Sequence, residues 1–127
     1  MNDRSLARST ESVAHYRLSD LTPAPFSPRG ASTNELMNAD SGARIASGIV
    51  YFRDCEIAFA LWYDEVMICH AVEEEFEIAV GDAIYPMRAG DMMWIPAGTS
   101  LVWRSKGTSM AFFAVTPADW AKNRPQS

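Results

Sequence analysis

Short apolar runs separated by turn signals dominate the chain from about residue 43 onward. Runs of four to eight residues that are rich in β-branched and aromatic side chains, and bounded by Gly, Pro or Asp, are typical of β-strands. The pair Gly81-Asp82 favours a hairpin turn. About eight strands are predicted, at residues 45–52, 56–63, 66–72, 76–80, 83–87, 92–95, 99–104 and 109–115. Closely spaced short strands of this kind predict an all-β antiparallel sandwich or barrel.

The two ends of the chain differ from this pattern. Residues 1–30 are rich in Ser, Thr, Arg and Pro, and their prolines exclude a long helix. We expect residues 1–30 to form an N-terminal arm that is flexible or strand-swapped onto a partner, with a short strand at residues 16–18. Residues 31–127 are expected to form the single folded domain, and residues 116–123 a short C-terminal helical turn.

Composition narrows the range of partners. The chain has 127 residues, of which 48% are hydrophobic, and this suits one domain with a substantial core. Its 16 acidic and 11 basic residues give a net charge of −5, which argues against nucleic acid as a partner. No apolar run is long enough to span a membrane, and no signal-peptide core is visible, so we expect a cytoplasmic protein. Cys55 and Cys69 lack a paired metal-binding spacing and are expected to be reduced thiols.

The most specific sequence feature is the stretch GDMMWIPAGTSL at residues 90–101. It resembles the second cupin motif, Gly-x5-Pro-x-Gly-x2-His, with Leu101 at the histidine position. Glycine at Gly90 and Gly98 permits tight turns between strands that a side chain would obstruct. The resemblance implies a single RmlC-like jelly-roll cupin barrel.

The first cupin motif, HxHxxxE, is also altered. If Glu65 is its glutamate, the two histidine positions hold Phe59 and Leu61. The chain contains only His15 and His70, so one subunit cannot build a three-histidine metal site. We therefore expect no metal and no other cofactor.

A closer resemblance exists within the cupins, and it covers about residues 45–120. The segment AFALWYDEV at residues 58–66 resembles the Tyr-Asp-Glu segment of EutQ-like ethanolamine-utilization cupins, and residues 112–120 resemble their Pro-x-x-Trp ending. This family is known for lacking the histidine metal site, is tied to ethanolamine catabolism, and has an acetate kinase activity attributed to it. The chain shows no P-loop or other phosphate-binding motif, so its residues do not themselves predict a kinase.

Strand alternation predicts which side chains line the barrel. If Glu65 points inward, Tyr63, Leu61 and Phe59 share its face, and the second motif places Leu101, Trp103 and Ser105 on the inward face as well. The predicted pocket is an aromatic wall with one phenol and one carboxyl group, and such a lining suits a small organic metabolite.

Glu65 and Tyr63 are the candidate catalytic residues. Burial raises the pKa of a carboxyl group, so Glu65 could act as an acid or base near neutral pH. Tyr63 could donate a hydrogen bond or proton to a developing oxyanion. The structural alternatives are a rim carboxylate that is hydrogen-bonded or paired with Arg, and a core aromatic residue with a satisfied hydroxyl group.

His70 is a further candidate ligand-binding residue whose direction depends on register. Compared with the EutQ-like pattern, the chain carries about two extra residues after Glu65. Simple alternation turns His70 away from the pocket, whereas a bulge could turn it inward.

The residues leave four functions open. The first is a metal-free cupin that binds a small organic metabolite, and the second is an acid–base lyase, isomerase or hydrolase that uses Glu65 and Tyr63. The third is a metal-dependent cupin with a non-standard site built from Glu65, His70 and Cys69. The fourth is an accessory or assembly protein of a catabolic pathway. In each case we expect a homodimer.

Overall fold

The computed structural model describes residues 13–22 and 24–125. Its regular structure is almost entirely strand, and every strand pairing is antiparallel, so the all-β prediction is confirmed. The strands are β1 (Ala31–Met37), β2 (Ala46–Ala60), β3 (Asp64–Val72), β4 (Glu75–Val80), β5 (Ala83–Pro86), β6 (Met92–Ile95) and β7 (Ser100–Thr116). Short 3-10 helices are η2 (Leu18–Asp20), η3 (Ala39–Ser41) and η4 (Trp120–Asn123).

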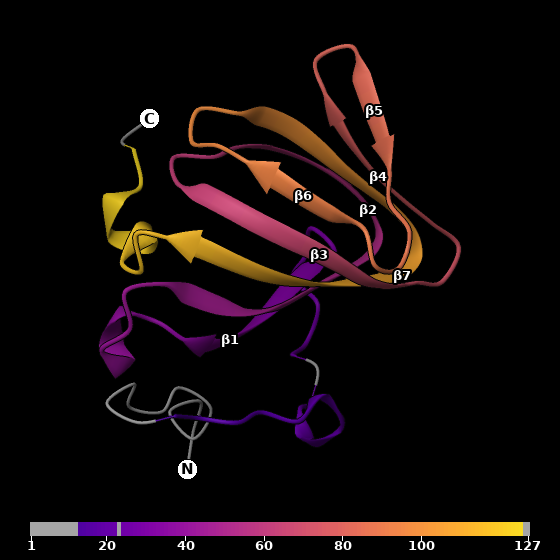
Figure 1. Cartoon of the computed structure of the whole chain (residues 1–127). Coiled ribbons are helices and arrows are strands. Elements are labelled where there is room, and N and C mark those ends of the chain that lie inside the picture. The colour runs from indigo at the N-terminus through magenta and orange to yellow at the C-terminus, as the bar shows by residue number, and fades with distance from the viewer. Residues whose placement is uncertain (1–12, 23, 126–127) are drawn as a thin grey trace.

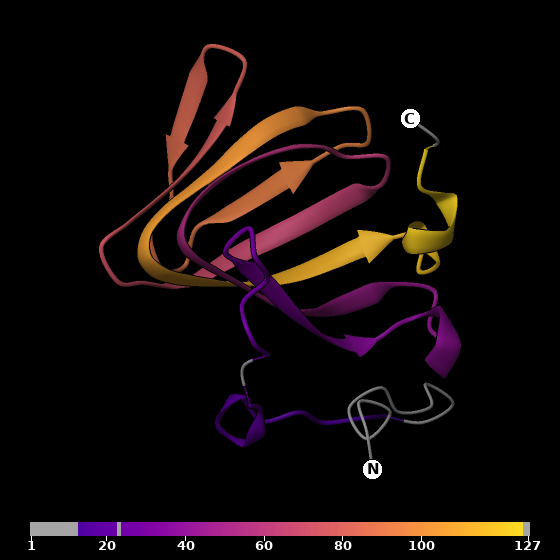
Figure 2. The ribbon, with the colours of Figure 1, turned by 180° about the vertical axis from the view of Figure 1, so that it is seen from behind.

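Two long strands, β2 and β7, form the frame of the molecule. They pair with each other along nearly their whole length, within a sheet of order β1-β2-β7-β3-β6. The first part of β7 also pairs with β4, and its second part pairs with β3. Both long strands curve, so the sheet folds over on itself, with the β4–β5 hairpin projecting at one end and η4 at the other (Figures 1 and 2).

β2 and β7 are each continuous, with a bend, at the place where the sequence pattern predicts two strands separated by a turn. Residues 45–52 and 56–63, expected as two strands, largely merge into β2, and residues 99–104 and 109–115 merge into β7. Asp54 has a φ of 44° at a register shift in β2, and Gly107 has a φ of 69°. The amide of Gly107 donates to Asp54 Oδ1 at 2.7 Å. The polar residues at these points therefore specify bulged bends in continuous strands rather than turns.

β1 was not predicted as a strand, and the strand expected at residues 16–18 is wrong. Leu18 begins η2, and the two preceding residues are irregular. The described part of the arm instead lies beside β1, where Asn34 Nδ2 donates to the carbonyl of Thr22 at 2.8 Å. The Tyr16 hydroxyl donates to the carbonyl of Leu36 at 3.2 Å. Residues 1–12 of the predicted arm lie outside the described residues.

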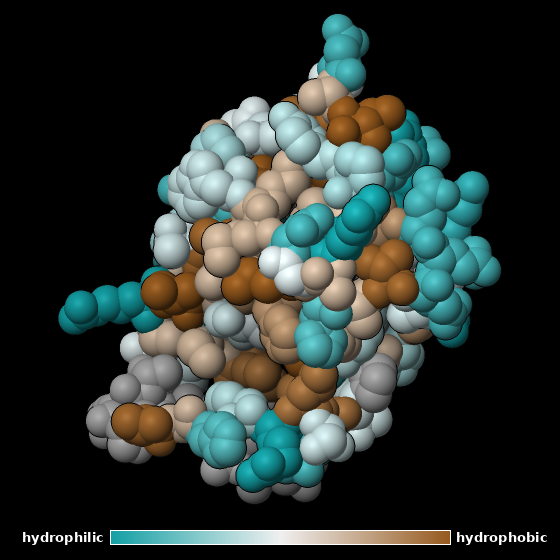
Figure 3. Space-filling model, turned by 45° about the vertical axis from the view of Figure 1, so that its right-hand side comes forward, coloured by the Kyte–Doolittle hydropathy of each residue, from teal (hydrophilic) through white to brown (hydrophobic). Residues whose placement is uncertain are grey.

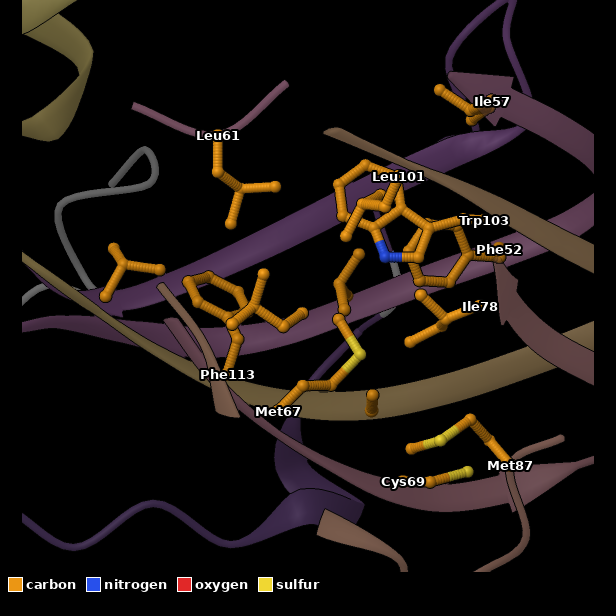
Figure 4. Packing of buried hydrophobic residues seen from close by; sticks show 14 of the residues in the cluster. Phe52, Ile57, Leu61, Met67, Cys69, Ile78, Met87, Leu101, Trp103 and Phe113 are labelled. Atoms are coloured by element: carbon orange, nitrogen blue, oxygen red, sulfur yellow. The ribbon is translucent and has the colours of Figure 1, made fainter. Parts of the chain in front are cut away.

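The core lies between the two parts of the folded sheet. Phe52 stacks on Phe76 with ring centroids 5.2 Å apart, and Trp103 packs 5.4 Å from Phe52. Figure 4 shows Leu101, Trp103, Phe52 and Ile78 gathered on one side of this interior. The inward alternation predicted for residues 101, 103 and 105 is present, because all three side chains are buried. The predicted C-terminal helical turn is also present, as η4.

The outer surface carries a mixture of polar and apolar side chains. Figure 3 shows hydrophobic residues interrupted by hydrophilic ones on the face that it presents. Large apolar side chains are exposed on β5 and β6, including Ile84, Tyr85, Met92 and Trp94. In the described part of the chain, no helix has the length and apolar character needed to cross a membrane.

Candidate functional site

A cavity of about 170 Å³ lies at the end of the sheet where β7 leads into η4. An engineered apolar cavity of roughly 150 Å³ accommodates benzene, so this space has the scale of a small organic molecule. The lining draws on four strands, the β2–β3 connection and η4. It consists of Ala31, Thr33, Glu35, Val50, Phe52, Tyr63, Glu65, Met67, Trp103, Phe113, Val115 and Trp120.

Glu65 is the most unusual group in this lining. Strand β3 places it in register with Ile95 on one side and Val115 on the other, and only 5% of its surface is exposed. Its carboxyl group makes no hydrogen bond or ion pair with any residue that the structure describes. Burial raises the pKa of Glu65 to about 7, because the charged form loses its hydration. The group is therefore divided between acid and carboxylate near neutral pH.

Tyr63 lies two residues before Glu65 and lines the same cavity. Its ring packs 5.1 Å from the rings of both Trp62 and Trp120. Burial raises the pKa of its hydroxyl group, the charge of Glu65 raises it further, and Arg124 partly opposes both effects. Tyr63 therefore remains a neutral hydrogen-bond donor at physiological pH.

The short helix η4 closes one side of the cavity with Trp120. Trp62 Nε1 donates to the carbonyl oxygen of Trp120 at 2.7 Å, and Trp120 Nε1 donates to Glu35 Oε2 at 3.3 Å. These two bonds attach η4 to the β2–β3 connection and to β1. The cavity wall is therefore made by segments from both ends of the described chain.

Trp103 contributes a second polar group without a partner. It lies between Phe52 and Phe59, at 5.4 Å and 5.3 Å between ring centroids. Its indole Nε1 is buried and has no hydrogen-bond partner among the described residues. Buried polar groups normally find partners, so the unpaired carboxyl group of Glu65 in the cavity lining marks a place for a ligand or for water.

Comparison with known proteins identifies the family. The family model described as "Ethanolamine utilisation protein EutQ" matches residues 15–122. The chain belongs to the EutQ family. It is 25% identical over 93 residues to the acetate kinase EutQ of Escherichia coli strain K12, a match that covers 73% of this chain and 39% of that relative. The chain thus corresponds to about two-fifths of the relative's length.

Solved structures share the fold of this EutQ-family chain. The EutQ protein of Clostridium difficile has a TM-score of 0.78 at 16% identity, covering 92% of this chain and 89% of the other. An RmlC-like cupin from Shewanella frigidimarina has a TM-score of 0.62 at 17% identity, covering 84% and 93%. The prediction of an RmlC-like cupin fold is therefore confirmed.

The structure brings some of the predicted site residues together and separates others. Glu65, Tyr63 and Trp103 line the cavity, as predicted. Leu61 and Leu101 point inward but belong to the packed core rather than to the lining (Figure 4). Phe59 is half-buried and packs against Trp103 without lining the cavity.

His70 lies outside the cavity, which corrects its place among the candidate ligand-binding residues. A register shift between Cys69 and Ala71 makes His70 the extra residue of a bulge in β3. Alternation buries residues 65, 67 and 69, and the bulge then leaves the His70 side chain exposed, with its ring 5.2 Å from Phe112. This bulge is the one that the sequence pattern allowed, but it does not turn His70 inward.

The residues at the usual cupin metal-ligand positions do not fit a metal ion. Phe59, Leu61 and Leu101 occupy the three histidine positions, and Glu65 is the one remaining ligand type. Over residues 13–22 and 24–125, the structure places no three His, Cys, Asp or Glu side chains where they could hold a metal ion together.

The sequence pattern missed the contribution of β1 and η4 to the site. Thr33 and Glu35 line the cavity from β1, and Trp120 lines it from η4. The Pro-x-x-Trp ending was the only sequence signal for Trp120, and the polar segment at residues 31–37 gave none.

Proposed function

We propose that this EutQ-family chain binds a small organic molecule in the cavity around Glu65, without a metal ion. The observation that carries the proposal is the buried carboxyl group of Glu65, which faces the cavity and lacks a partner among the described residues. Leaving such a group unpaired costs free energy, and a ligand that hydrogen-bonds to it offsets that cost. An apolar lining with few polar groups is the usual composition of a small-molecule site.

The proposal is tested by screening neutral and charged fragments of about benzene size against protein labelled with 13C at its methionine methyl groups. Met67 lines the cavity, whereas Met92 is exposed on β6, so the two methyl groups distinguish binding in the cavity from binding elsewhere. We expect saturable shifts of the Met67 resonance for some fragments, with Met92 unchanged.

A blocking variant makes this screen decisive. Thr33 lines the cavity but is itself exposed, so Thr33→Trp should fill part of the cavity with little disturbance of the core. Ala83→Trp, on exposed β5, is the matched control. Binding should be lost in Thr33→Trp and retained in Ala83→Trp. A complete absence of cavity binders in the unmodified protein would disprove the proposal.

The raised pKa of Glu65 favours a second candidate function, general acid–base catalysis. A carboxyl group with a pKa of about 7 can both accept and donate a proton near neutral pH, and the neutral Tyr63 hydroxyl group can stabilise a developing oxyanion. The reaction class would be an elimination, an isomerisation or a hydrolysis. For a substrate found by the screen, Glu65→Gln should abolish turnover while binding persists. Turnover that survives both Glu65→Gln and Tyr63→Phe would disprove this assignment.

We also propose a cytoplasmic homodimer. Cys55 and Cys69 are free thiols, which fits a reducing compartment. The exposed apolar side chains of Met92 and Trp94 on the edge strand β6 supply a surface that a second copy could cover. Light scattering on the full chain should give twice the monomer mass, and a monomer at micromolar concentration would contradict the dimer.

A further inference from the structure

The charge and aromatic character of the cavity point to one class of ligand. We infer that the cavity accepts a small organic cation, such as a primary alkylammonium or a tetraalkylammonium ion. This inference rests on the proposed function and narrows it, because it selects cations over neutral molecules and anions of the same shape.

The ionisable side chains in the lining are acidic apart from one neutral phenol. Glu65 on β3 and Glu35 on β1 both line the cavity, and no Lys, Arg or His occurs among the described residues that line it. Arg124 is close enough to affect Tyr63, but its guanidinium group lies over the Trp62 ring at 5.2 Å and outside the lining. A carboxylate or phosphate in this space would lose hydration beside two carboxyl groups without gaining a cationic partner.

The apolar part of the lining suits a cation as well. Tyr63, Trp103, Phe113 and Trp120 present aromatic rings to the cavity from the β2–β3 connection, β7 and η4. Aromatic faces attract ammonium groups through the negative potential of the ring, and the attraction strengthens when the cation is desolvated. The same rings offer an anion no comparable attraction.

The unpaired state of Glu65 explains why a cation is favoured over a neutral molecule. A neutral alcohol can hydrogen-bond to Glu65, but it leaves the ionised carboxylate as an uncompensated buried charge. An ammonium ion supplies both the hydrogen bond and the opposite charge. The cavity of about 170 Å³ limits the ligand to a few carbon atoms around the cationic centre.

Three molecules of matched shape test the inference: propylammonium, 1-propanol and propionate. Each is titrated into the full chain at pH 8, with the Met67 methyl resonance as the report on the cavity and the exposed Met92 as the internal control. We expect saturable shifts of Met67 with propylammonium, at least about tenfold weaker binding of 1-propanol, and no binding of propionate.

Substitutions separate the charge of Glu65 from the charge of the whole protein. Glu65→Gln preserves size and should weaken propylammonium binding about thirtyfold or more, because it removes the buried partner of the cation. Glu75→Gln makes the same change in net charge on β4, outside the cavity, and should leave the affinity unchanged. If Glu65→Gln fails to fold, Glu35→Gln serves instead, with an expected loss of about threefold or more.

The outcomes distinguish the inference from the proposed function. Propionate binding in the cavity as tightly as propylammonium overturns the inference, as does propylammonium binding that Glu65→Gln leaves unchanged. Binding of neutral fragments at Met67 without any binding of propylammonium also overturns it, but leaves the proposed function standing. If no fragment of any charge shifts the Met67 methyl resonance, both the inference and the proposed function are overturned.

Discussion

Trp120 Nε1 donates a hydrogen bond to Glu35 Oε2 at 3.3 Å, joining two residues that lie 85 positions apart in the sequence. Both side chains line the cavity, Trp120 from η4 and Glu35 from β1. The carbonyl of Trp120 also accepts a bond from Trp62 Nε1 at 2.7 Å. The position of η4 over the cavity therefore depends on polar contacts in addition to ring packing.

We expect Trp120→Phe to loosen η4 without opening the core. The variant keeps an aromatic ring against Tyr63 but removes the N–H that binds Glu35. Loss of one partly exposed hydrogen bond should lower the free energy of unfolding by about 1 kcal/mol. Hydrogen exchange should accelerate in η4, and urea unfolding measures the stability. Trp94→Phe on exposed β6 is the control, and equal exchange of η4 in both variants would contradict the prediction.

The stability of the protein should fall as the pH rises from about 4.5 to about 7 through the titration of Glu65. Its pKa is 4.5 in an ordinary environment and about 7 in the folded protein, so the folded state binds the proton more tightly than the unfolded state. The contribution of the protonated group is therefore fully present below the lower pKa and is lost above the higher one. Over the whole interval this loss amounts to about 3 kcal/mol.

Comparison with Glu65→Gln isolates this effect, because the other carboxyl groups titrate alike in both proteins. The difference in unfolding free energy between variant and wild type should move in favour of the variant as the pH rises from 4.5 to 8. Chemical denaturation at several pH values measures it. A constant difference across that range would show that Glu65 is not buried in a poorly hydrated site.

Much of the site follows from alternation along strands. Residues 63 and 65 share the inward face, as do residues 101, 103 and 105, because each pair of neighbours is separated by one outward residue. The sequence also predicts the turns at Gly90 and Gly98, and in the structure both residues have a positive φ. These features are local, and periodicity captures them.

The remaining features depend on contacts that local patterns do not encode. The segment at residues 31–37 is polar and includes residues that favour helices, yet it forms β1 because it pairs with β2. His70 is a bulge residue, and a single inserted residue changes the face of every later side chain in the strand. Trp120 lines the cavity from η4, where it contacts Glu35 of β1, a residue 85 positions away in the sequence.

Gly48→Ala should detach β1 from the sheet. Gly48 pairs with Glu35, and a Cβ atom at this position would lie 2.9 Å from Glu35 Cα and would overlap the carbonyl oxygen of Asn34. Backbone atoms cannot yield as a flexible side chain would, so the substitution should cost about 1–3 kcal/mol. Hydrogen exchange should accelerate in β1 while β3 serves as the internal reference. Unchanged protection of β1 would contradict the close approach seen here.

Asp54 should be replaceable by Asn but not by Ala. Asp54 has a φ of 44°, and its Oδ1 accepts a hydrogen bond from the amide of Gly107 at 2.7 Å. Asn tolerates the left-handed region and retains the acceptor, whereas Ala loses both advantages. We expect Asp54→Ala to cost about 2 kcal/mol of unfolding free energy, and Asp54→Asn less than about half of that. Equal losses in thermal or urea unfolding would show that this bond does not hold the two bends together.

Binding of tetramethylammonium should depend on pH through Glu65. This ion does not titrate, so any pH dependence belongs to the protein. A cation favours the carboxylate, so binding below the pKa of about 7 requires release of a proton. The dissociation constant should therefore fall by up to about tenfold for each unit of rising pH below 7 and level off above it.

Other ionisable groups face the same space and must be separated from Glu65. Glu35 faces it from β1 and Tyr63 from the β2–β3 connection, while Arg124 acts on Tyr63 from beyond η4. Calorimetric titration from about pH 5 to about pH 8.5 should show this pH dependence of the dissociation constant in wild type and in Glu35→Gln, but a flat profile in Glu65→Gln. A flat wild-type profile would place the cation away from Glu65, since a carboxyl group that contacts a bound cation must couple its proton to the binding equilibrium.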